Sequence, residues 1–73
     1  MEYNILSPDG FTISIDNFAT KADALTGFIL WRKRYERQGY YSSCNGRISL
    51  KQLKHKCQMI TIKKNEIIKE CYM

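Results

Sequence analysis

The sequence lacks the residue groupings that usually carry catalysis, cofactor binding or metal binding. It has one histidine, and its three cysteines, at positions 44, 57 and 71, show no C-x-x-C spacing. No glycine-rich phosphate-binding loop is present, and no two of the seven carboxylates are closely spaced on one predicted face. We therefore expect a protein that is not an enzyme and that holds no cofactor.

Long apolar runs are missing as well. The longest uncharged apolar run is 28–31, far short of the ~20 residues of a membrane-spanning helix. The first residues lack the charged and apolar regions of a signal peptide, and an odd number of cysteines argues against a disulfide framework. These absences predict a cytoplasmic protein with reduced thiols and no membrane association.

Charge is unevenly distributed along the 73 residues. Residues 1–31 carry a net charge of −3, residues 32–64 carry ten Lys or Arg and one Glu for +9, and residues 65–73 carry −1. The basic block 32–64 raises the prospect of a polyanionic partner through counterion release. Lysine-rich solvated faces are also common in small soluble proteins, so the block alone assigns no function.

The N-terminal residues predict a β-hairpin. Apolar residues alternate with polar or small ones over residues 3–5 and again over 11–15. The intervening residues 7–10 include Pro8, which presets φ, and Gly10, which accepts a positive φ. Two antiparallel strands are therefore expected before the first helix.

That helix is predicted over residues 21–38. Thr20 stands three residues before Asp23, a capping-box-like pair with a short carboxylate, and Gly39 supplies a C-terminal stop. At about 100° per residue, one stripe faces the core and Leu30 falls on the opposite side with the basic residues. The inward stripe consists of Ala24, Phe28, Trp31 and Tyr35.

A strand, a turn and a second helix are predicted next. Residues 40–43 have strand composition, and Asn45 with Gly46 is a strong turn pair. Ser49 with Gln52 matches a capping box at the start of a helix. The predicted inward face of this helix holds Leu50, Leu53 and Cys57.

Residues 59–62 predict a strand that closes the sheet. The tail fits either one face of a helix or, after a turn at Lys64 and Asn65, a last strand, which we favour. The expected fold is α+β, in the order β-β-α-β-α-β with or without a C-terminal strand, with helices packed on an antiparallel or mixed sheet. One domain spans 1–73, in which 65–73 form a strand or a loosely attached tail.

The central residues resemble a known group of proteins. Residues 38–43 read QGYYSS and are followed by GRI at 46–48, then by Leu50, Leu53 and Cys57. This pattern is similar to that of a group of short uncharacterised bacterial proteins that share GYYSS, GRI, two leucines and a cysteine. The resemblance covers roughly residues 18–62 and implies a stand-alone small domain. The group has no assigned activity, so the resemblance implies no functional residue.

His55 and Cys57 form an H-x-C motif, to which Cys44 or Cys71 would add a further ligand toward the four of a structural zinc site. Side chains two residues apart on a helix are separated by ~200° around its axis, so His55 faces water if Cys57 faces the core. We expect no metal site and a buried Cys57 that acts as a small hydrophobic residue.

Cys44 is the cysteine that we expect at the surface. It lies in the turn before Arg47, whose guanidinium would lower the pKa of the thiol. Nucleophilic catalysis also needs a base and an oxyanion hole, and the sequence identifies neither.

Nucleic acid binding is one function that the basic residues suit. Tyr40 and Tyr41 beside arginines suit base stacking, but adjacent strand residues point to opposite faces, so one tyrosine at most would stack. Arg47 would contact phosphate, cap carbonyl groups or lie on Tyr41. A nucleic-acid-binding accessory protein that uses the block 32–64 is the alternative hypothesis.

The favoured hypothesis is a non-enzymatic protein-interaction or regulatory module. Leu30 is an exposed apolar side chain amid basic residues and suits a helical or acidic partner, although single exposed leucines often have no function. Self-association through this surface or through a sheet edge is equally consistent with the pattern. The predicted contact residues are Leu30, Lys33, Arg34, Arg37 and Arg47.

Overall fold

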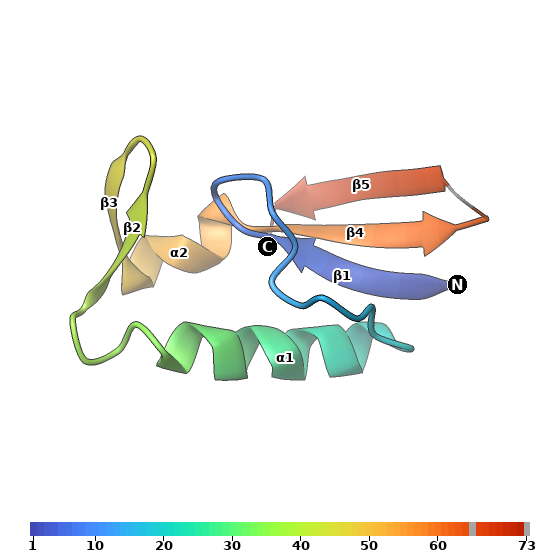
Figure 1. The fold of residues 1–73 in the computed structure, drawn as a ribbon, viewed down its shortest axis with the longest axis horizontal. Helices are drawn as coiled ribbons and strands as arrows, with labels where there is room; N and C mark the ends of the chain where they lie inside the picture. The colour runs from blue at the N-terminus through green and yellow to red at the C-terminus, as the bar shows by residue number, and fades with distance from the viewer. Residues whose placement is uncertain (65, 73) are drawn as a thin grey trace.

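The computed structural model describes residues 1–64 and 66–72, which form two antiparallel sheets and two helices (Figure 1). The α+β class is confirmed, but the order is β-α-β-β-α-β-β and not β-β-α-β-α-β. The elements are β1 (Glu2–Leu6), α1 (Lys21–Lys33), β2 (Tyr40–Ser43), β3 (Gly46–Ser49), α2 (Leu50–Lys56), β4 (Gln58–Lys63) and β5 (Glu66–Tyr72).

The larger sheet has the strand order β1-β4-β5. β4 pairs antiparallel with β1, with Ile5 opposite Met59, and with β5, with Thr61 opposite Ile68. β4 is thus the central strand, whereas the sequence predicted that it would close the sheet. The favoured strand in the tail is confirmed as β5. Asn65 of the predicted turn and the side chain of Cys71 lie outside the described part of the chain.

The predicted N-terminal hairpin does not form beyond its turn. The Gly10 N–H donates to the Ser7 carbonyl at 2.9 Å, and Gly10 has a φ of +87°, as expected. After the turn, the chain makes only isolated bridges to β1 and forms no second strand among the described residues. Phe11 and Ile15 are exposed, so the alternating pattern there does not mark a buried sheet face.

A buried asparagine explains why the returning segment leaves the strand ladder. The fully buried Asn4 side chain donates from Nδ2 to the Ser14 carbonyl at 3.1 Å and to Asn17 Oδ1 at 3.0 Å. Together with a few backbone bonds, such as that from the Ile13 N–H to the Ile5 carbonyl at 2.9 Å, these side-chain bonds hold the segment against β1 in an irregular conformation.

Helix α1 begins as predicted but ends earlier. Thr20 Oγ1 accepts a hydrogen bond from the Asp23 N–H at 3.0 Å, which satisfies one of the free amides of the first turn. The buried residues of α1 are Ala24, Phe28 and Trp31, which confirms the inward stripe. The α-helix ends at Lys33 instead of residue 38, because the following N–H groups bond three residues back and tighten the chain into turns.

Gly39 ends these turns with a φ of +81°, in the left-handed region predicted for it, and nothing lies within 4 Å of an added Cβ. We expect Gly39→Ala to lower the free energy of unfolding by about 1 kcal/mol or more, because a Cβ disfavours this backbone conformation. Urea denaturation measures the change. Gly39→Asn is the control and should cost less, since asparagine tolerates positive φ. An alanine variant as stable as wild type would contradict this explanation of the stop.

A second, two-stranded sheet follows. β2 and β3 pair antiparallel around the predicted turn, with Tyr41 opposite Ile48. The sequence did not predict β3, and it predicted a capping box that is absent, because the Ser49 side chain makes no cap hydrogen bond. Leu53 is fully buried and Leu50 is half-buried, as predicted for the inward face of α2. Cys57 is fully buried as well, but it follows the helix in an extended conformation and does not lie on that face.

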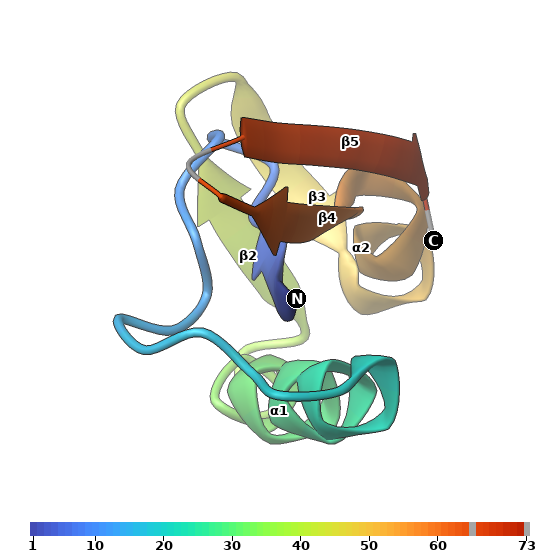
Figure 2. The ribbon, with the colours of Figure 1, turned by 90° about the vertical axis from the view of Figure 1, so that its right-hand side faces the viewer.

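One hydrophobic cluster joins both helices to both sheets. Figure 1 shows α1 running below the three-stranded sheet toward the β2–β3 hairpin, with α2 between hairpin and sheet. In the end-on view of Figure 2, α2 and the segment between β1 and α1 lie on opposite sides of the strands. The cluster contains Ile5, Ala24, Phe28, Trp31, Tyr41, Leu53, Cys57 and Met59.

Candidate protein-binding groove

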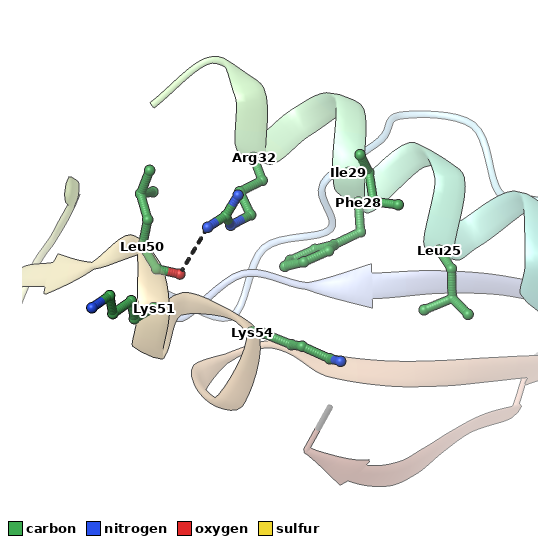
Figure 3. A pocket seen from close by; sticks show the side chains of 7 residues that line it. All are labelled: Leu25, Phe28, Ile29, Arg32, Leu50, Lys51 and Lys54. Atoms are coloured by element: carbon green, nitrogen blue, oxygen red, sulfur yellow. Dashed lines mark hydrogen bonds between the residues drawn. The ribbon is translucent and has the colours of Figure 1, made fainter. Parts of the chain in front are cut away.

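A groove of about 440 Å³ lies between α1 and α2 (Figure 3). Hereafter it is called the α1–α2 groove. Its apolar lining consists of Leu25, Phe28, Ile29 and Leu50, and its cationic lining consists of Arg32, Lys51 and Lys54.

The apolar side of the groove comes mainly from α1. Phe28 belongs to the core stripe and is 5% exposed, whereas Leu25 and Ile29 are 44% and 55% exposed. Leu25 and Ile29 are four residues apart, so they are neighbours on one face of the helix. They lie beside the core stripe and leave an apolar rim in contact with water.

Arg32 connects the two helices at one end of the groove. Its Nη2 donates to the Leu50 carbonyl at 3.4 Å (Figure 3). Its Nη1 lies 3.5 Å from Glu36 Oε1. The guanidinium therefore satisfies a carbonyl in the first turn of α2 and shares its charge with a carboxylate. Its remaining capacity for a ligand is reduced.

Lys51 and Lys54 lie on the α2 side and are exposed. No ion pair to either lysine is present among the side chains that the structure describes, namely those of residues 1–64 and 66–69. In Figure 3 the Lys54 side chain extends toward the Leu25 end of α1, whereas Lys51 extends the opposite way. Among the described residues the lining includes no carboxylate, so the groove combines an apolar floor with positive charge, of which only that of Arg32 is paired, with Glu36.

The contact residues predicted from sequence lie outside this groove. Leu30 is 59% exposed, as predicted, and Lys33 is the last residue of α1. Arg34 and Arg37 lie in the turns that follow, because the α-helix ends earlier than expected. The charges therefore do not form the single helical face that the sequence predicted.

Arg47 and the two tyrosines occupy the hairpin. The Arg47 guanidinium lies 4.4 Å from the ring centroid of Tyr40, and not on Tyr41 as expected. Tyr41 is buried while Tyr40 is half-exposed, which confirms that the adjacent side chains point to opposite faces. Of these two tyrosines, the one whose ring is more open to a nucleobase is thus already covered by a cation.

Sequence reasoning did not identify Leu25, Ile29 and Lys54 as residues that line a groove. Leu25 was recognisable as a flank of the core stripe, and Ile29 follows it at helical spacing. The position of Lys54 opposite them depends on how α2 packs, which no local pattern encodes.

Asp9 joins the N-terminal turn to the β2–β3 turn. Its Oδ1 accepts hydrogen bonds from the Cys44 N–H at 3.0 Å and from Cys44 Sγ at 2.9 Å, and its Oδ2 accepts one from the Tyr41 hydroxyl at 3.0 Å. The bonds from Cys44 lower the pKa of the Asp9 carboxyl.

These contacts correct the prediction for Cys44. The cysteine is exposed, as expected, but the carboxylate of Asp9 beside it raises the pKa of the thiol, whereas a nearby Arg47 was predicted to lower it. Because the Asp9 carboxylate accepts a hydrogen bond from the Cys44 thiol, it favours the neutral thiol, which is a weaker nucleophile than the thiolate.

The lowered pKa of Asp9 predicts a pH dependence of stability. A carboxyl whose pKa is lower in the folded state stabilises the fold above its ordinary pKa of 3.8, and this contribution is lost as the pH falls through the folded-state pKa. We expect Asp9→Asn to destabilise the fold at neutral pH and the difference from wild type to shrink in acid. Urea denaturation at about pH 7 and about pH 3 measures it. Asp16→Asn, at another exposed aspartate, is the control, and an Asp9→Asn effect that stays constant with pH would contradict the expectation.

The two residues of the H-x-C motif differ in their exposure to solvent. His55 is exposed and Cys57 is fully buried, and burial raises the pKa of the Cys57 thiol to about 12. Within the described part of the chain, no three His, Cys, Asp or Glu side chains lie close enough together to hold a metal ion. Among residues 1–64 and 66–72, neither helix is both long and apolar enough to cross a membrane.

Comparison of the chain with protein-family models, curated proteins and solved structures gave no match in any of the three. The resemblance of residues 18–62 to short bacterial proteins therefore stays a prediction. The function is therefore inferred from the geometry of the α1–α2 groove.

Proposed function

We propose that this chain is a non-enzymatic, cytoplasmic protein-binding module whose contact surface is the α1–α2 groove. The observation that supports this function is the exposure of Leu25 and Ile29 beside the buried Phe28 ring. Exposed apolar side chains gathered in a groove and bordered by polar ones are typical of protein contact sites.

The lining favours a macromolecular contact over a small ligand. Sites for small molecules enclose most of the ligand and place a few polar groups to fix its orientation. Here the apolar walls are half open to water, and the one guanidinium in the lining already bonds Leu50 and Glu36. A partner with its own apolar side chains would bury Leu25 and Ile29 and gain from excluding water.

Nucleic acid binding is the less well supported alternative. Arg47 lies on Tyr40 and Arg32 is shared with Glu36, so neither cation is fully available for phosphate. An apolar rim also contributes nothing to phosphate contacts, which dominate nucleic acid affinity.

Photo-crosslinking at two neighbouring positions tests the proposed surface. A benzophenone amino acid replaces either Ile29, which lines the groove, or Leu30, which lies outside it with nearly the same exposure, 55% against 59%. We expect a protein adduct of discrete mass from position 29 in lysate, and none from position 30. The adduct should survive nuclease, and excess wild-type protein should abolish it by competition while excess Ile29→Asp protein should not.

Other outcomes would count against this surface. An adduct from position 30 alone would place the contact on the outer face of α1, with Leu30 and Lys33. Adducts lost on nuclease treatment would indicate nucleic acid as the bridging partner, and the absence of any protein adduct at position 29 would overturn the proposed function.

A further inference from the structure

The charge of the α1–α2 groove indicates the chemistry of the partner that it would bind. Every ionisable residue in the lining is cationic, and α2 itself contains Lys51, Lys54 and Lys56 without any acidic residue. Among the side chains that the structure describes, which leave out those of residues 65 and 70–73, no carboxylate pairs with either lysine of the groove. A ligand that supplies carboxylates next to apolar side chains would therefore complement both parts of the groove.

The surrounding backbone indicates the conformation of such a ligand. All the lining residues belong to α1 or α2, and no strand edge borders the groove. An extended peptide bound here would find no ladder of free N–H and C=O groups to pair with, whereas a helix satisfies its own backbone. The exposed i, i+4 pair Leu25 and Ile29 also presents the ridge spacing that packs against another helix.

We propose that the α1–α2 groove binds an acidic amphipathic helix from a protein partner. This inference rests on the proposed function and names its partner class. Apolar side chains at i, i+3 and i+4 of the ligand helix contact Leu25, Phe28 and Ile29. Aspartate or glutamate on its flank pairs with Lys51 and Lys54, on the α2 side.

An anionic membrane surface is the competing occupant, because cations beside apolar groups also suit lipid headgroups. The geometry favours the helix. A flat bilayer would need apolar side chains that protrude, whereas the Phe28 ring is buried at the floor and the apolar residues line a hollow between two helices (Figure 3).

The test uses synthetic peptides with known chemistry. A fluorescent helical peptide of about 18 residues, with leucines on one face and glutamates along the flank, is titrated with the folded protein, and fluorescence anisotropy reports binding. A scrambled peptide of identical composition removes the amphipathic pattern, and a peptide with lysine in place of glutamate reverses the charge. Vesicles with anionic lipid headgroups test the membrane.

Matched double variants separate the groove from general charge. Lys51→Glu with Lys54→Glu should weaken binding of the glutamate peptide about 10-fold or more and should bind the lysine peptide better than wild type does. Lys33→Glu with Arg34→Glu makes the same change in net charge outside the groove and should alter affinity less than about 3-fold at physiological salt. Circular dichroism establishes that each variant is folded.

Several results would overturn the inference. The scrambled peptide binding as tightly as the patterned one, equal losses in the two double variants, or binding of vesicles without binding of the peptide would each do so. A crosslinked protein at Ile29 together with no affinity for the glutamate peptide would leave the proposed function standing and reject only the acidic helix as its partner.

Discussion

Trp31→Ala is expected to cost about 3–5 kcal/mol and to leave the protein largely unfolded. The indole lies at the junction of α1 with the β2–β3 hairpin, with ring centroids 5.9 Å from Phe28, 5.1 Å from Tyr35 and 5.4 Å from Tyr41. Removing it opens a cavity and breaks contacts to three aromatic rings at once. Near-UV circular dichroism and thermal melting report the loss.

The control is Leu30→Ala on the neighbouring position of the same helix. Leu30 is exposed, so its truncation should change the stability by no more than about 0.5 kcal/mol. A Trp31→Ala variant that keeps a native near-UV spectrum and melting curve would mean that the aromatic cluster is not a structural core.

Asn4→Ala should have the second largest effect, a loss of about 2–3 kcal/mol. The side chain is fully buried, donates to the Ser14 carbonyl and to Asn17 Oδ1, and accepts from the Ile5 N–H at 2.8 Å. Alanine removes all three bonds and leaves buried polar groups without these partners. Urea denaturation gives the change in the free energy of unfolding.

Asn17→Ala isolates one of these bonds. Asn17 is exposed, so water can replace it and its removal should cost less than about 1 kcal/mol. Equal stability of the Asn4→Ala and Asn17→Ala variants would show that the buried amide does not hold the segment after β1.

Helical features were the most predictable from sequence because their signals are local. The stripe of Ala24, Phe28 and Trp31 follows from a period of 3.6 residues, and the N-cap role of Thr20 follows from capping chemistry. The positive φ of Gly39 was predicted as well, although the α-helix ends earlier, at Lys33. Each of these signals acts within a few residues of chain, so no knowledge of the tertiary structure is required.

The sheet was less predictable because its partners are distant in sequence. The alternation around residues 11–15 resembles a strand, but Asn4 bonds the segment in an irregular path. Strand β4 was recognisable, yet its central place depends on β1 and β5 both pairing with it. Local patterns do not encode whether other strands pair with one edge of a strand or with both edges.

Predicting the α1–α2 groove would require both the local helical pattern and the tertiary packing of the helices. The exposure of Leu25 and Ile29 follows from the helical period, but their position opposite Lys51 and Lys54 requires the packing of α2. The contact surface predicted from sequence, around Leu30 and Arg37, therefore differs from the α1–α2 groove and stays a prediction.

The pairing of β1 with β4 dictates when the chain can fold during its synthesis. β1 is made first, but its ladder partner begins at Gln58, so a nascent chain carries an unpaired strand with Ile5 until the intervening residues 7–57 have been added. At about 5–20 residues per second the ribosome needs roughly 3–10 s for that stretch. Helix formation takes about a microsecond, so the formation of α1 does not limit this process. The larger sheet is thus assembled only after β4 has been synthesised, and the apolar residues of β1 lack their sheet partner for seconds.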